Sequence, residues 1–152
     1  MSLSAIIKAV QDIMRQDAGV DGDAQRISQL VWMIFLRVFD AKEEEWELIA
    51  DDYTPVIPEG LRWRDWAADD EGITGDELLD FVNNRLFKEL KEMKLDEHSS
   101  PKAFIVKAVF EDSYNYMKSG TLMRQVINKL NEIDFTTQKD RHLFKDIYEN
   151  IL

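Results

Sequence analysis

Cysteine is absent from this chain of 152 residues. Its absence excludes disulfide bonds and thiolate chemistry, and it agrees with a reducing compartment such as the cytosol. Glycine is sparse as well: the six glycines never form a Gly-x-Gly element, which phosphate and dinucleotide cradles require. No serine lies in a Gly-x-Ser-x-Gly nucleophile elbow. These absences leave the sequence without a recognisable active site.

Histidine is scarce too, and this bears on metal binding. His98 and His142 are the only two histidines, and neither has the spacing to a second ligand that zinc sites use. The acid clusters Glu43–Glu45 and Asp69–Glu71 are candidate cation sites, but a solvated acidic surface is the commoner origin of such runs. We therefore predict no metal site.

Long apolar runs are also missing. The longest extends from Leu30 to Leu36, far below the roughly 20 residues that a membrane span needs. The segment from Ser4 to Met14 has the pattern of an amphipathic helix and contains Lys8 and Asp12, unlike a secretory signal. We expect no membrane segment, no signal peptide and a cytoplasmic location.

The net charge is −11, with 30 acidic and 19 basic side chains. All of the acidic excess lies in residues 1–77, because residues 78–152 carry equal numbers of both signs. Binding to DNA phosphates requires clustered Lys and Arg. The chain alone is therefore expected to bind DNA poorly, so that a nucleic-acid role needs a local patch or a larger assembly.

The most informative segment that is present runs from Asp23 to Trp46. One face of the helix that it predicts is apolar at helical spacing, and the opposite side is apolar too, at Trp32, Met33 and Leu36. A helix that is apolar all round must be enclosed by other elements. We therefore predict that this segment is the central helix of an all-α core. Its acidic end near Ala50 is expected to be ordered by packing of Trp46, Leu48 and Ile49.

The remaining pattern predicts a compact, all-α bundle of about five to six helices with one long irregular connection, residues 51–74. A capping box at Thr74–Glu77 and a cap with proline at Ser99–Pro101 begin two of these helices. Gly120 is expected to end the helix that starts at Pro101. The predicted helices cover residues 2–16, 23–50, 74–93, 101–118, 121–133 and 140–152.

Two basic features could recognise a ligand. Arg62, Trp63, Arg64 and Trp66 combine guanidinium groups with large aromatics, as in sites that stack on bases or anchor a protein partner. The alternative, which we favour, is that both tryptophans fix the loop to the core while the arginines pair with nearby acids.

The other basic feature is a series on the predicted helix 74–93, formed by Arg85, Lys88, Lys91 and Lys94. Glu89 and Glu92 interleave with these residues, so pairing within the helix is the commoner explanation. Contact with DNA phosphates or with a protein partner is the alternative for this series.

Three separate stretches carry a family resemblance: Leu3 to Glu47, Pro58-Glu-Gly-Leu-Arg-Trp-Arg-Asp-Trp66, and Leu143-Phe-Lys-Asp-Ile-Tyr-Glu-Asn-Ile-Leu152. Together they resemble the N-terminal helical domain of the modification (M) subunit of type I restriction–modification systems. The resemblance implies an N-terminal helical domain over residues 1–139. Residues 140–152 would begin a helix that leads toward a methyltransferase domain, as the abrupt end at Leu152 also suggests.

In that family the methyltransferase domain binds S-adenosylmethionine at a glycine-bearing loop and holds a flipped adenine with an Asn-Pro-Pro-Phe-type motif. Neither element occurs in this sequence, so the resemblance transfers no catalytic, cofactor-binding or metal residue. It implies that this stretch is not itself an enzyme and needs no cofactor. The full-length protein would be an adenine-specific DNA methyltransferase that uses S-adenosylmethionine.

The resemblance also implies partners. Two modification subunits and one specificity subunit form the methyltransferase of this family, restriction subunits join them, and the assembly acts on double-stranded DNA. The helical domain would contribute subunit contacts and closure around DNA. The alternative is a generic helical protein–protein interaction module with no nucleic-acid role.

Overall fold

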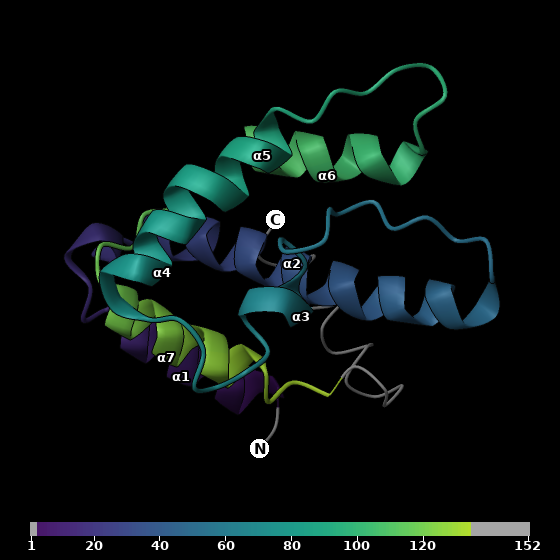
Figure 1. The fold of residues 1–152 in the computed structure, drawn as a ribbon. Helices are drawn as coiled ribbons and strands as arrows, with labels where there is room; N and C mark the ends of the chain where they lie inside the picture. Colours follow the sequence, from purple (N-terminus) through teal and green to yellow (C-terminus); the bar gives the residue numbers. More distant parts are fainter. Residues whose placement is uncertain (1–2, 135–152) are drawn as a thin grey trace.

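The computed structural model describes residues 3–134 of the protein, and this part contains helices and irregular segments but no strand. Figure 1 shows the central helix α2 with the other helices above and below it. The all-α prediction is confirmed. The elements are α1 (Leu3–Met14), η1 (Ala18–Val20), α2 (Asp23–Ile49), α3 (Trp63–Trp66), α4 (Gly75–Phe81), η2 (Val82–Leu86), α5 (Phe87–Lys91), α6 (Pro101–Glu111) and α7 (Gly120–Leu130).

Helix α2 is enclosed as its sequence predicts. Trp32, Met33 and Leu36 are fully buried, and Ile34 on the other face is 3% exposed. Trp32 packs edge-on against Phe87 of α5, with ring centroids 4.9 Å apart, and also contacts Phe110 of α6. These aromatic contacts join three helices, and burial of such large apolar side chains supplies most of the free energy that holds them together.

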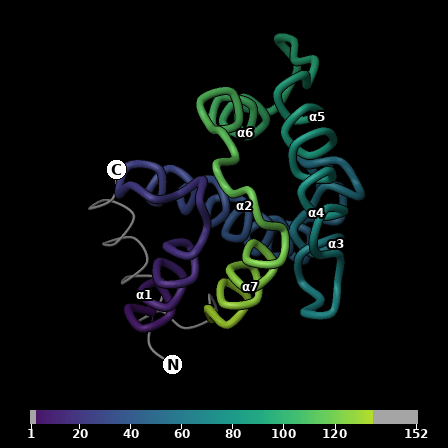
Figure 2. The backbone as a smooth tube through the Cα atoms, turned by 90° about the vertical axis from the view of Figure 1, so that its left-hand side faces the viewer, coloured from purple at the N-terminus to yellow at the C-terminus, as the bar shows by residue number. Residues whose placement is uncertain are grey.

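The outer helices form two pairs around α2. Helices α1 and α7 pack against each other on one side of α2, and α5 packs with α6 on the other side, as Figures 1 and 2 both show. The predicted helix 74–93 is present as the continuous run α4–η2–α5, in which η2 is a π-helical turn. Such a turn adds one residue per turn and shifts the faces of the helix that follow it.

The predicted helix 101–118 is too long. It begins as expected, with Pro101 in its first turn and the Ser100 side chain accepting from Lys102 N–H, but α6 ends at Glu111. Residues 112–119 are irregular because their backbone binds other elements: Tyr116 N–H donates to the Gln29 side chain, and Lys118 N–H donates to Asp17. A tertiary interaction has therefore overridden the local helical pattern.

Gly120 begins α7, so the prediction that it ends the preceding helix is wrong. A Cβ at Gly120 would clash with the carbonyl oxygen of Gly75, the first residue of α4. Glycine is required here because the backbones of two helix starts lie in contact. Helix α4 begins where the capping box predicted, but the Thr74 side chain makes no capping hydrogen bond, so the predicted box is not formed.

The acidic end of α2 is only partly packed as predicted. Trp46 contacts the ring of Phe39, and the ammonium of Lys102 lies 3.6 Å from the centre of the Trp46 ring. Leu48 and Ile49 are 86% and 83% exposed, so their predicted packing is wrong. Of the three apolar residues predicted to order this end of the helix, only Trp46 packs against other side chains in this way.

Two further predictions concern the C-terminal residues and the absence of a membrane segment. The proposed domain boundary and the helix over 140–152 lie outside the described residues. Within residues 3–134, every helix is too short or too polar to cross a membrane.

Candidate functional site

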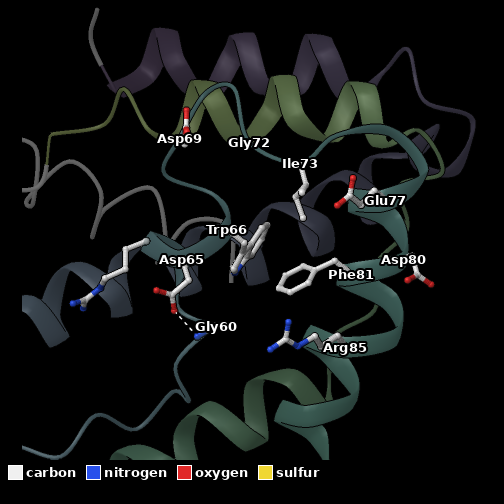
Figure 3. A pocket seen from close by; sticks show the side chains of 11 residues that line it. Gly60, Asp65, Trp66, Asp69, Gly72, Ile73, Glu77, Asp80, Phe81 and Arg85 are labelled. Carbon is white, nitrogen blue, oxygen red and sulfur yellow. Dashed lines mark hydrogen bonds between the residues drawn. The ribbon is translucent and has the colours of Figure 1, made fainter.

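An open pocket of about 610 Å³ lies between α3, the loop that follows it and the α4–η2 run. Figure 3 shows the rings of Trp66 and Phe81 directly beside each other, with centroids 5.2 Å apart, and carboxylates and Arg85 around them. Its walls are Gly60, Arg64, Asp65, Trp66, Asp69, Gly72, Ile73, Glu77, Asp80, Phe81 and Arg85. We call this cavity the first pocket.

Arg62 is held by an acid on its own turn. Its guanidinium donates two hydrogen bonds of 2.9 Å to the two carboxylate oxygens of Asp65. Asp65 also accepts from the N–H of Gly60 at 2.8 Å. The Arg62 hydrogen bonds, opposed by partial burial, hold the pKa of Asp65 below its ordinary value. This pair closes the turn that begins α3.

Arg64 connects α3 to α2. It donates to Asp40, which is 3% exposed, at 2.9 Å and to Glu47 at 3.1 Å. Burial by itself would lower the pKa of Arg64, but its hydrogen bonds to Asp40 and Glu47 raise it. The arginine therefore forms an ion pair with a buried carboxylate that also interacts with Arg37.

The two tryptophans of this segment belong to the core. Trp63 and Trp66 are both buried, with ring centroids 5.5 Å apart. The Trp63 indole donates to Asn131 at 2.7 Å, and the Trp66 indole donates to the carbonyl of Leu61 at 3.1 Å. These contacts agree with the favoured interpretation of Arg62–Trp66. A DNA or partner contact by Arg62, Trp63 or Arg64 stays a prediction.

A buried arginine that the sequence analysis missed organises the rest of the loop. Arg124 of α7 is 5% exposed. Its guanidinium donates to the carbonyl oxygens of Trp66, Ala67, Asp69 and Ile73 at 2.9 to 3.1 Å. Burial lowers the pKa of Arg124, and the negative charges of Asp69 and Asp70, which raise it, only partly offset this effect. One cation thus satisfies four backbone acceptors between Trp66 and Ile73.

Glu43 corrects the solvated-surface interpretation of its acid cluster. Its side chain is buried, with the residue 1% exposed. It accepts hydrogen bonds from the Tyr53 hydroxyl and from the backbone N–H groups of Val56 and Ile57, at 3.1 to 3.3 Å. Burial, followed by the Glu43 charge, raises the pKa of Tyr53. Glu43 therefore fixes the start of the long connection to α2.

The basic series on α4–η2–α5 is divided between different surroundings. Arg85 lines the first pocket, 3.6 Å from Glu89 and 5.6 Å from the Phe81 ring centre. Lys88 is exposed. Lys91 lies 5.5 Å from the centre of the Phe87 ring and lines a different pocket. The structure therefore brings Arg85 together with Arg64 but separates Lys91 from both.

This second pocket has a volume of about 730 Å³. Its walls come from η1, the start of α2, the α4–η2–α5 run and the irregular segment after α6. The lining residues are Ala18, Gly19, Gln25, Leu79, Asn83, Phe87, Lys91, Tyr114, Asn115, Tyr116, Met117 and Lys118. Two lysines and no carboxylate are among them.

Buried polar groups hold the irregular wall of the second pocket. Gln29 of α2 donates to Asn115 at 2.9 Å and accepts from Tyr116 N–H at 2.7 Å. Asn115 in turn donates to Asn83 at 2.9 Å. Asp17 accepts from the N–H groups of Gly19, Lys118 and Ser119 at 2.8 to 3.0 Å. The wall is therefore anchored at several points.

Sequence reasoning missed Asp17, Gln29, Glu43, Asn115 and Arg124 as organising residues. A signal existed for Gln29, a polar residue between apolar positions of the central helix, but its partner lies 86 positions away in the sequence. Among residues 3–134, no group of three or more acids, histidines or cysteines is placed to hold a metal ion. The described candidate site thus consists of two open pockets.

The described part of the chain is thus an all-α domain with two open pockets. The sequence profile of the HsdM N-terminal domain family matches residues 3–130. The chain belongs to this family. It is also 61% identical, over its whole length, to the EcoEI methylase subunit, a type I restriction enzyme component of Escherichia coli.

Two solved structures are similar to this one. A modification subunit of a candidate type I restriction enzyme from Vibrio vulnificus YJ016 matches with a TM-score of 0.90 and 35% identity over 98% of this chain. A structure described as showing complex assembly and conformational transition of the type I restriction–modification system matches with a TM-score of 0.81 and 35% identity, again over 98%. The chain spans about a third of these relatives' lengths: 31% of the EcoEI subunit and 34% and 29% of the solved chains.

Proposed function

We propose that this chain is the non-catalytic helical domain of a cytoplasmic type I DNA methyltransferase subunit. It contributes to subunit assembly and to closure around double-stranded DNA. The partners are a specificity subunit, a second modification subunit and restriction subunits. The observation that carries the proposal is the likeness over 98% of this chain to a modification subunit of which it spans only 34%.

The chemistry of adenine methylation belongs outside this chain in our proposal. S-adenosylmethionine would supply the methyl group, but the glycines of the first pocket do not fit a cofactor cradle. A Cβ at Gly60 or Gly72 would lie 2.9 Å from a guanidinium nitrogen of Arg85 or Arg124, respectively. Arginine side chains already fill the space that these glycines leave, so we assign no cofactor contact here.

Deletion of residues 1–134 from the full-length modification subunit tests the proposal. We expect the shortened subunit to retain S-adenosylmethionine binding but to lose affinity for duplex DNA in the assembly with the specificity subunit. Isothermal titration would measure cofactor binding, and fluorescence anisotropy would measure DNA binding. Light scattering would report the subunit stoichiometry. Unchanged stoichiometry together with unchanged DNA affinity would contradict the proposed role.

The net charge of −11 supports the alternative of a protein–protein module with no nucleic-acid role. The same deletion separates the two functions. Loss of subunit stoichiometry, with normal DNA affinity in any assembly that still forms, would favour the alternative.

A further inference from the structure

The second pocket differs from the rest of this acidic protein in its charge. Lys91 and Lys118 line it, and none of its lining residues is a carboxylate. The first pocket, by contrast, has an acidic excess, with two arginines in its walls against four acidic residues, Asp65, Asp69, Glu77 and Asp80. An anionic ligand is therefore favoured at the second pocket and disfavoured at the first.

Asn83 and Tyr114 add hydrogen-bond donors to the lysines of the second pocket. The Asn83 side chain accepts from Asn115 through Oδ1, which leaves its Nδ2 as the donor for a ligand. Tyr114 is 63% exposed, and its ring meets that of Tyr116 at 4.9 Å with an interplanar angle of 72°. Tyrosine hydroxyls, asparagine amides and lysines are all frequent donors to DNA phosphates.

The pocket is also preformed. Asp17 and Gln29 are buried and hold the backbone of residues 116–119 through hydrogen bonds. A Cβ at Gly19 would clash with the carbonyl oxygen of Tyr116, so the absence of a side chain there allows η1 to lie directly against this segment. A ligand would therefore meet donors that are already ordered, which lowers the entropic cost of binding.

We propose that the second pocket binds the phosphate backbone of duplex DNA, with Lys91 and Lys118 as the cationic contacts and Tyr114 and Asn83 as hydrogen-bond donors. This inference rests on the proposed function, since it assigns the DNA contact of that function to a particular surface. The contact is independent of base sequence because it involves only phosphates.

The experiment uses the full-length modification subunit assembled with its specificity subunit. Lys91→Gln/Lys118→Gln is compared with Lys42→Gln/Lys129→Gln, which removes the same charge from lysines that pair with Glu45 and Glu132. The affinity for a target duplex and for an unrelated duplex is measured over a range of salt concentrations.

We expect the first pair of substitutions to weaken binding to both duplexes. The slope of log affinity against log salt should become shallower by about 1.8, because each phosphate contact contributes about 0.9. The control pair should leave the slope unchanged. Tyr114→Phe, which removes only a hydroxyl, should weaken binding without changing the slope.

Three outcomes would overturn the inference. An unchanged slope for Lys91→Gln/Lys118→Gln, while deletion of residues 1–134 does reduce DNA affinity, would reject this pocket and leave the proposed function intact. DNA affinity that is unchanged by the deletion and by the lysine substitutions would reject the proposed function as well as the inference about this pocket. Loss of subunit stoichiometry with normal DNA affinity would identify the pocket as a protein interface.

Discussion

Two irregular connections of this domain, residues 51–74 and 112–119, are held in the same way but present different surfaces. Each is fastened by buried polar side chains that satisfy its backbone. Glu43 and Arg124 serve the first connection, and Asp17 and Gln29 serve the second. Without such partners, the buried N–H and C=O groups of an irregular segment would be costly.

The difference lies in the charged residues. In the first connection, Arg62 and Arg64 both pair with carboxylates, and Asp40 is nearly fully buried. Lys118 in the second connection, and Lys91 beside it, line a pocket without carboxylates. The comparison teaches that the acceptors within reach, rather than the number of basic residues, decide whether a basic segment is available to a ligand.

The largest effect on stability is expected from a substitution that removes Arg124, which anchors the first connection. Arg124→Met should lower the free energy of unfolding by about 4 kcal/mol, because four carbonyl oxygens lose a charged donor in a buried place. Urea denaturation followed by circular dichroism measures this. Arg15→Met, at an exposed ion pair with Asp12, is the control and should cost less than about 0.5 kcal/mol.

The matching change in the second connection is Gln29→Leu. This substitution should lower the free energy of unfolding by about 3 kcal/mol, since Asn115 and the Tyr116 N–H lose their buried partner. Hydrogen exchange should show faster exchange at residues 115–119, with protection kept in residues 66–73. Gln125→Leu, at an exposed position of α7, is the matched control. Equal loss of protection in both connections would mean that they are not separate units.

A smaller effect is expected from Arg64→Met. The substitution removes the guanidinium that donates to buried Asp40, although Arg37 also interacts with this carboxylate. We expect it to lower the free energy of unfolding by about 2 kcal/mol, less than for a fully buried pair because Arg64 is partly exposed. Lys91→Gln/Lys118→Gln should change stability by less than about 0.5 kcal/mol. Thermal unfolding of Arg64→Met and of Lys91→Gln/Lys118→Gln tests whether only the paired arginine contributes to stability. A lysine variant less stable than Arg64→Met would contradict this expectation.

Among the ion pairs and hydrogen bonds that hold the two connections, the smallest expected effect on stability is that of Asp65, and it depends on pH. Because the Arg62 hydrogen bonds lower the pKa of Asp65 in the folded protein, the unfolded chain binds the proton more tightly. The pair's contribution is fully present above the unfolded pKa, near 3.8, and is lost as the pH falls through the lower folded pKa. Asp65→Asn should cost about 1 kcal/mol at neutral pH and progressively less in acid.

Urea denaturation at several pH values measures this dependence. Asp76→Asn, at an exposed position in α4, provides the comparison. A destabilisation by Asp65→Asn that did not vary between neutral and acid pH would contradict the role of the Arg62–Asp65 pair.

Much of the helical framework could be predicted from local pattern. The enclosed helix around Trp32 and the start of α6 at Pro101 follow from apolar periodicity and from capping chemistry, which involve residues close in sequence. The end of α6 could not be predicted in this way. Residues 112–118 have no local helix breaker, and their irregular path depends on Gln29 and Asp17, which precede them by more than 80 positions.

The candidate site shows the same limit. The pairing of Arg62 with Asp65 was foreseeable because the two residues are three positions apart. The pairing of Arg64 with Asp40 and the burial of Glu43 required the first connection to fold back along α2. The sequence groups Lys91 with Arg85, whereas the fold places them in separate pockets.

By itself, the sequence determined that the protein is helical, that α2 is its enclosed centre and that its family is recognisable, because periodicity, caps and motif order are local properties of the chain. Only the tertiary structure decided which cations are neutralised and which remain at a pocket wall. An ion pair forms where a carboxylate comes within reach in space, and distance in space follows from the folded path of the chain.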